Sequence, residues 1–136
     1  MNINDIQKVE IKGDKLEVMF SRQSELEDKY TPIELSNGES IPLLPLDVNS
    51  FEGQRRIRAI IYRITEELYE AGNCLRNKAW KQSQVPTDVD HFLEELSDSF
   101  HFMIQLYLEL GIGPEELCSL YFRKSEVNIF RQKTNY

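Results

Sequence analysis

Four carboxylates with a regular spacing are the residues of this sequence best suited to do chemistry. Glu67 and Glu70 stand three residues apart, and so do Glu95 and Asp98. If both segments are helical, each pair shares one helix face, because side chains three or four residues apart in a helix are neighbours. Two such helices packed side by side would bring four carboxylates together. Hard divalent cations prefer oxygen donors, so the sequence predicts a metal site.

The first pair of acids lies in a segment that predicts a long amphipathic helix over about residues 51–76. Asn49, with Glu52 three residues later, is typical of a helix start with a capping acid. Apolar residues then recur at three- and four-residue spacing, and they are Ile57, Ile61, Ile64, Leu68, Ala71 and Leu75. At about 100° per residue, Glu67 and Glu70 flank this stripe on the same side, whereas Glu66 points more nearly away from the core.

The second pair of acids lies in a helix expected over about residues 88–110. The second half of this segment is apolar almost all round, which indicates a helix that is buried on several sides. Glu95 and Asp98 point in nearly the same direction as Phe102 and Leu106, so we expect an enclosed face. Two acids on such a face are costly unless they are paired or bind a metal.

The remaining segments predict two further helices and one irregular connection. One helix is expected over about residues 15–30, and another begins at Pro114. Residues 31–50 contain three prolines and the Asn37-Gly38 turn signal, so we expect an ordered irregular connection, with a small hairpin at Asn37-Gly38. A lid over a ligand is the alternative interpretation of this connection.

These elements predict an all-α fold: a single domain over residues 1–136, built as a bundle of about four main helices. A chain of 136 residues can bury a sizeable core. Because a helix that is apolar almost all round needs many neighbours, we expect homo-oligomerisation, as a dimer or a tetramer, to complete the bundle.

Basic and amide side chains occur at two places that could face the acids. Lys78, Trp80 and Lys81 lie between the two acidic helices, where a solvated connection and a loop that contacts a metal-bound polyphosphate are both plausible. The last helix carries Lys124, Asn128 and Arg131 on one face. They fit either complementation of the helix dipole or contact with phosphate.

Composition excludes several classes of function. Sixteen Lys and Arg against 23 Asp and Glu give a formal charge of −7, which argues against broad binding to nucleic acid or to an anionic membrane. No apolar run of about 18 residues and no secretory signal pattern occur, so we expect a cytoplasmic protein. The two cysteines have no metal-binding spacing, and we expect reduced thiols.

Together these residues resemble a known family. Glu66-Glu67-Leu68-Tyr69-Glu70 and Glu95-Leu96-Ser97-Asp98 are similar to the EExxE and ExxD motifs of the all-α nucleoside triphosphate pyrophosphatases, which include MazG-like enzymes and dimeric dUTPases. Further similarity to the phage-type branch is carried by Lys78-Ala79-Trp80-Lys81, His101-Phe102 and Lys124…Asn128…Arg131-Gln132…Tyr136. The resemblance implies hydrolysis of a (deoxy)nucleoside triphosphate to the monophosphate and pyrophosphate, which would control a dNTP pool. A phage-encoded member would act in the host cytoplasm.

The resemblance also implies roles for individual residues. Glu67, Glu70, Glu95 and Asp98 would bind Mg²⁺, with Mn²⁺ as a substitute, and Glu66 or Glu67 would orient or deprotonate the attacking water. Candidate phosphate ligands are Lys78, Lys81, Lys124, Asn128 and Arg131, and candidate base contacts are Gln23 and Trp80.

The base is left open by two residues of the first helix. By periodicity alone, Gln23 fits a core-edge amide as well as a base contact. Glu27 replaces the Asn or Asp that the family pattern has, so the resemblance does not fix uracil as the base and leaves a cytosine or purine deoxynucleotide open. A non-catalytic nucleotide- or metal-binding helical oligomer is the alternative for the whole chain.

Overall fold

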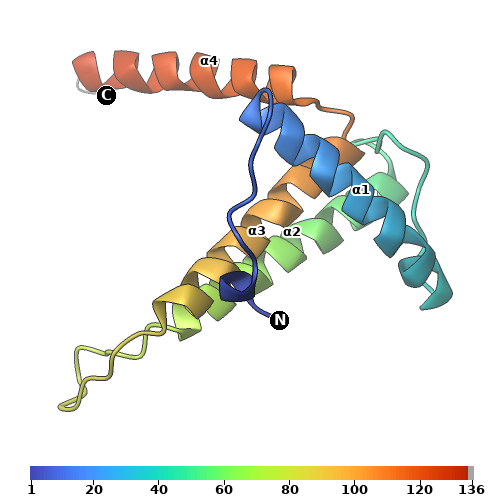
Figure 1. The fold of residues 1–136 in the computed structure, drawn as a ribbon. Helices are drawn as coiled ribbons and strands as arrows, with labels where there is room; N and C mark the ends of the chain where they lie inside the picture. The colour runs from blue at the N-terminus through green and yellow to red at the C-terminus, as the bar shows by residue number, and fades with distance from the viewer. Residues whose placement is uncertain (135–136) are drawn as a thin grey trace.

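The computed structural model, which describes residues 1–134, consists of helices joined by irregular connections (Figure 1). Four long helices follow a short 3₁₀ turn, η1 (Ile3–Asp5). They are α1 (Lys15–Ser36), α2 (Phe51–Asn73), α3 (Val89–Glu109) and α4 (Pro114–Lys133). No strand occurs within the described residues. The prediction of an all-α fold with about four main helices is therefore confirmed.

The helices begin where the sequence offers capping groups. The side chains of Asp14, Ser50 and Asp88 accept hydrogen bonds from the backbone N–H groups three residues later, at the starts of α1, α2 and α3. Pro114 opens α4, where a missing N–H has no cost. The predicted cap at Asn49 is wrong by one residue, because the Ser50 hydroxyl takes that place.

The boundary predicted at residue 31 is wrong, because α1 continues through Pro32 to Ser36. A proline removes one helical hydrogen bond. Because Pro32 lies near the end of a long helix, the remaining hydrogen bonds still hold the helix. The hairpin expected at Asn37-Gly38 is also absent. Asn37 ends α1, and Gly38 takes a positive φ of 92° in the turn that follows. The irregular connection therefore covers residues 37–50.

α2 and α3 run antiparallel and form the main packing unit (Figure 1). Ile60, Ile64 and Ala71 of α2 and Ile104 of α3 are buried between the helices, together with Phe20 of α1. The apolar stripe predicted on α2 is only partly covered: Ile61, Leu68 and Leu75 are 47%, 50% and 47% exposed. The apolar stripe of α2 is wide, and its main neighbour α3 covers only one side of it.

A buried ionic network ties the first three helices together. Arg56 of α2 donates to both carboxylate oxygens of Glu109 on α3, at 2.8 and 3.1 Å. Glu34 of α1 accepts from Arg56 at 2.9 Å and from Arg63 at 2.8 Å. Arg56 and Glu109 are 2% and 3% exposed, so each side chain compensates a charge that would be costly alone.

α4 contributes little to this packing. It has no buried residue, and its carboxyl-terminal half lies well apart from the α2–α3 pair (Figure 1). Several of its large apolar side chains are exposed, among them Tyr121, Phe122 and Phe130. Such a face needs a partner, so the predicted homo-oligomer remains a prediction that this surface favours. None of the helices within residues 1–134 is long and apolar enough to span a bilayer.

Candidate active site

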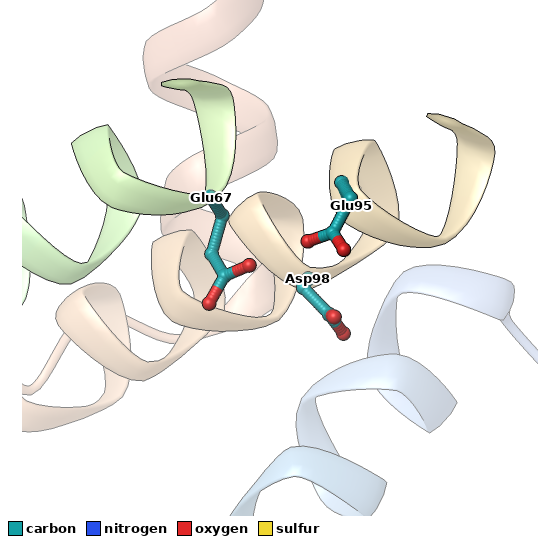
Figure 2. Close-up of side chains that lie close together, drawn as sticks. All are labelled: Glu67, Glu95 and Asp98. Atoms are coloured by element: carbon teal, nitrogen blue, oxygen red, sulfur yellow. The ribbon is translucent and has the colours of Figure 1, made fainter. Parts of the chain in front are cut away.

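Three of the four predicted metal ligands converge between α2 and α3. One carboxylate oxygen each of Glu67, Glu95 and Asp98 lies within 4.8 Å of the others. Figure 2 shows Glu67 of α2 and Glu95 of α3 pointing toward each other, with Asp98 about one turn further along α3. The antiparallel pairing of the two helices places residues from separate sequence segments side by side. The spacing of the acids predicts that four carboxylates converge, and the structure brings three of them together.

The carboxylates of this cluster perturb one another. The pKa of Glu67 is raised to about 7, first by burial, then by a hydrogen bond with Glu95 and by repulsion from Glu70 and Asp98. Burial also raises the pKa of Glu95, and repulsion from Glu70 adds to the effect. Both shifts show that ionisation of these carboxyls is disfavoured, chiefly by burial and in part by the neighbouring acids. A bound cation would relieve that repulsion.

Not every predicted acid joins the cluster in the same way. Glu70 lies outside the group of three, although its charge acts on both Glu67 and Glu95. Glu66 is exposed, as its direction on the helix predicts. The Glu95 side chain is 12% exposed, but Asp98 is exposed. The face expected to be enclosed is therefore open at Asp98 in the single chain.

A cavity of about 510 Å³ opens next to the cluster, between the end of α2 and the start of α3. Glu70 and Glu95 line it together with Arg76 and His91. The His91 Nε2 lies 3.4 Å from a Glu95 carboxylate oxygen, in an i, i+4 arrangement. Arg76 and His91 were not predicted as site residues. Arg76 lies in the connection between the two acidic helices, near Lys78 and Lys81, and His91 lies one helical turn before Glu95.

The predicted cationic contacts and the predicted base contact Trp80 lie elsewhere in the single chain. Lys78, Trp80 and Lys81 are exposed in the connection between α2 and α3, outside the residues that line this cavity. The side chain of Asn77 braces that connection by bonding the backbone N–H and C=O of Val85, at 2.8 and 3.0 Å. Lys124, Asn128 and Arg131 are on α4, which is separate from the cluster, and Tyr136 lies outside the described residues.

Gln23 has a partner that neither sequence interpretation anticipated. It is 3% exposed, and its Oε1 lies 2.9 Å from Nδ1 of His101, three residues after Asp98. The contact is with a side chain rather than with backbone, and it connects α1 to the helix that carries two of the acids. Gln23 is therefore positioned next to the acidic cluster, although it is not part of it.

The donor set fits a hard divalent cation. It consists of carboxylate oxygens alone, which suits Mg²⁺ or Mn²⁺ and not the softer metals that prefer thiolate or imidazole. Burial and the neighbouring carboxylates raise the pKa of Glu67, and a cation bound between these oxygens would favour its ionised form.

Comparison with known proteins agrees with the geometry. The family described as dUTPase matches residues 15–114, and residues 1–14 precede the match. The dCTP pyrophosphatase of Enterobacteria phage T4 is 25% identical over 129 residues, which cover 95% of this chain and 67% of that protein. The dCTP pyrophosphatase of Enterobacteria phage LZ5 is 36% identical over 55 residues, covering 40% and 32% of the two chains. No solved structure gave a significant match. With a family match over most of its length and acids that converge as the motifs predict, the chain belongs to the dUTPase family of all-α enzymes that hydrolyse nucleoside triphosphates.

Proposed function

We propose that the protein hydrolyses a pyrimidine deoxynucleoside triphosphate, dUTP or dCTP, to the monophosphate and pyrophosphate in a magnesium-dependent reaction. The observation that carries this proposal is the convergence of Glu67, Glu95 and Asp98 beside a cavity that also holds Arg76. The family supports uracil, and the two phage relatives support cytosine. Such an activity would control a dNTP pool in the cytoplasm, in a host cell if the protein is phage-encoded.

Glu67, Glu95 and Asp98 would hold the metal, with Glu70 close enough to contribute to the same charge. Bound Mg²⁺, or Mn²⁺ in its place, would neutralise phosphate charge and make a bound water more acidic. Four acids on two rigid helices are well suited to fix a ligand, because helices hold side chains more precisely than loops.

The chain itself supplies a proton acceptor and cations. Glu67 is the better candidate to take the proton of the attacking water, since it faces the cluster whereas Glu66 is exposed. Arg76 lines the cavity beside Glu70 and Glu95, so it is suited to bind the departing pyrophosphate. Lys78 and Lys81 follow it in the same connection and could close on that anion.

The cationic face of α4 would act on a second copy of the chain. Lys124, Asn128 and Arg131 are predicted phosphate ligands, yet the carboxyl-terminal half of α4 lies away from the α2–α3 pair of its own chain (Figure 1). Exposed aromatic side chains on the same helix give it a surface for self-association. A dimer that docks α4 against the partner's α2–α3 pair would bring these residues to the phosphates.

Pyrophosphate release from a panel of dNTPs, with Mg²⁺ and with a chelator, tests the activity. We expect dUTP and dCTP to be the best substrates and turnover to require the metal. Glu67→Gln and Asp98→Asn should each lower kcat at least about a hundredfold, because each removes a charged ligand. Glu25→Gln, a change at an exposed acid on α1, is the matched control. Full turnover in both site variants would refute the assignment of these residues.

Complementation between inactive variants tests the shared site. Asp98→Asn and Lys124→Ala chains are each expected to be poorly active alone. If sites are shared, mixing and re-pairing them should restore about a quarter of wild-type activity, because half of the dimers are mixed and each has one intact site. Activity that does not rise on mixing would mean that each site is formed by one chain.

A further inference from the structure

The amino-terminal segment is folded onto α3 next to the acidic cluster. Its turn η1 is closed by a capping box between Asn2 and Asp5. Two hydrogen bonds attach it to α3: the Ile3 N–H donates to Glu94 at 2.8 Å, and the Asn4 amide donates to Asp90 at 2.9 Å. The segment therefore has a defined position, although each of its residues 1–6 is exposed to solvent.

A second cavity, of about 340 Å³, lies between this segment and α3. One side is formed by Met1, Asn2, Ile3 and Ile6, and the other by Glu94, Ser97, Asp98 and His101. Asp98 belongs both to this cavity and to the acidic cluster. The two cavities therefore flank the cluster, one on the side of Glu70 and Glu95 and the other on the side of Asp98.

The two cavities differ in chemistry, and the difference assigns the two ends of a nucleotide. The cavity at Glu70 is lined in part by the connection between α2 and α3, including Arg76, which suits the outer phosphates. The cavity at Asp98 offers aliphatic side chains on one wall and hydrogen-bonding side chains on the other. That combination suits a nucleoside, whose base has an apolar face and polar edges, and the volume is in the range of small-ligand sites.

We propose that residues 1–6 form one wall of the nucleoside subsite, with Ile3 and Ile6 packed against the bound base or sugar. The inference rests on the proposed nucleotide hydrolysis, because the phosphates are what anchor the ligand at the cluster. Ile3 and Ile6 are 48% and 49% exposed, so they have apolar surface available for a ligand. Glu94 acts as a positioning residue, because it holds the segment through the Ile3 N–H.

This wall precedes the residues that match the family, so it lies outside the matched part of the chain. Two hydrogen bonds at an exposed site hold the segment only weakly. A nucleoside that buried the two isoleucines would add contact area to that attachment. The segment should therefore become more ordered when a nucleotide binds.

The test compares two double variants of the full chain. Ile3→Ser with Ile6→Ser removes the apolar wall, whereas Val9→Ser with Ile11→Ser changes two residues of the same segment that are 55% and 46% exposed and do not line the cavity. Titration calorimetry measures binding of dCMP and dUMP, which carry the nucleoside, and of inorganic tripolyphosphate with Mg²⁺, which does not.

We expect the Ile3 and Ile6 variant to bind both nucleoside monophosphates at least about fivefold more weakly, while its affinity for tripolyphosphate stays within about twofold of wild type. The Val9 and Ile11 variant should match wild type for every ligand. In hydrolysis, the first variant should raise KM and leave kcat nearly unchanged.

Three results would overturn the inference: unchanged monophosphate binding in the Ile3 and Ile6 variant, equal weakening of monophosphate and tripolyphosphate, or no monophosphate binding to the wild type. In the first case the nucleoside belongs on the Arg76 side. If wild-type protein hydrolyses no dNTP but its monophosphate binding depends on the two isoleucines, the proposed function fails and the subsite stands.

Discussion

Replacing Glu27 by Gln should make the protein more stable at alkaline pH. Glu27 lies on α1 at the edge of the buried ionic network, and its pKa is raised from 4.5 to about 8. Burial is the largest cause, and repulsion from Glu109 adds to it, while a hydrogen bond with Gln23 and the charge of Arg56 act in the opposite direction. Asp28, the next residue of α1, also repels it. Glu27 is therefore neutral over most of the physiological pH range.

The geometry gives the neutral form a role. Glu27 Oε1 and Gln105 Oε1 are both buried and lack a hydrogen-bond partner among the described residues, and the two side chains line the same cavity of about 30 Å³. Two acceptors cannot satisfy each other, but a proton on Glu27 turns one of them into a donor. A glutamine at position 27 would provide an amide donor at every pH.

The sign and size of the effect follow from proton linkage. Between pH 4.5 and 8 the folded chain keeps this proton and the unfolded chain has lost it, so the stability that the neutral carboxyl provides disappears as the pH rises. At about 1.4 kcal/mol per pH unit, the free energy of unfolding falls by on the order of 3 to 5 kcal/mol over that interval. Because glutamine does not ionise, Glu27→Gln should remove this pH-dependent decrease in the free energy of unfolding.

Urea unfolding of wild type and Glu27→Gln at pH 5, 6, 7 and 8 measures this difference directly. The two should be similar at pH 5, and the variant should be the more stable by a few kcal/mol at pH 8. Glu25→Gln, a change at an exposed residue on the same helix, controls for loss of a surface charge. Parallel stability curves for wild type and Glu27→Gln would refute the idea that Glu27 is held neutral.

Three further outcomes are expected. Gly53→Ala should destabilise the protein by about 2 kcal/mol or more in urea unfolding, because the added Cβ would overlap the carbonyl oxygen of Asp47; an unchanged midpoint would contradict that packing. Glu109→Gln should cost on the order of 3 kcal/mol, since it leaves the charge of the buried Arg56 poorly compensated; a loss below about 1 kcal/mol would mean that Glu34 suffices. Mg²⁺ should raise the melting temperature of wild type but not of Asp98→Asn, and equal shifts would exclude Asp98 from the metal site.

Local signals in the sequence were sufficient for most of the fold. Capping side chains and apolar periodicity marked α2, α3 and the start of α4 to within a few residues. The end of α1 was missed because Pro32 was taken as a boundary, whereas a helix of 22 residues has enough other hydrogen bonds to continue past it. Apolar spacing also failed to separate Ile60, which is fully buried, from Ile61, which is not, since each helix is covered on only one side.

The candidate site could be predicted only in part, because local sequence patterns do not show which helix faces pack against each other. Spacing within a helix fixed which acids share a face, and antiparallel pairing of α2 and α3 then joined Glu67 to Glu95 and Asp98. The buried partners Arg56 and Glu109 were missed, although each lies on the apolar side of its helix, where a charge demands a counter-charge. Residues 1–6 show only a weak alternation in the sequence, because two hydrogen bonds to acids of α3, and not a helix face, hold them.

The charge of the site predicts that a single chain would bind a triphosphate weakly. The cluster of Glu67, Glu95 and Asp98, with Glu70 nearby, would face a ligand that is itself strongly anionic, so repulsion would dominate unless cations intervene. The cavity beside these acids offers Arg76, while the lysines of the connection lie outside its lining. One divalent cation and one arginine balance only part of that charge. The deficit favours a site that gathers Lys78 and Lys81 by closure and Lys124 and Arg131 from a second copy. Metal binding and assembly should therefore each tighten nucleotide binding, and a dilution that dissociates the oligomer should raise KM.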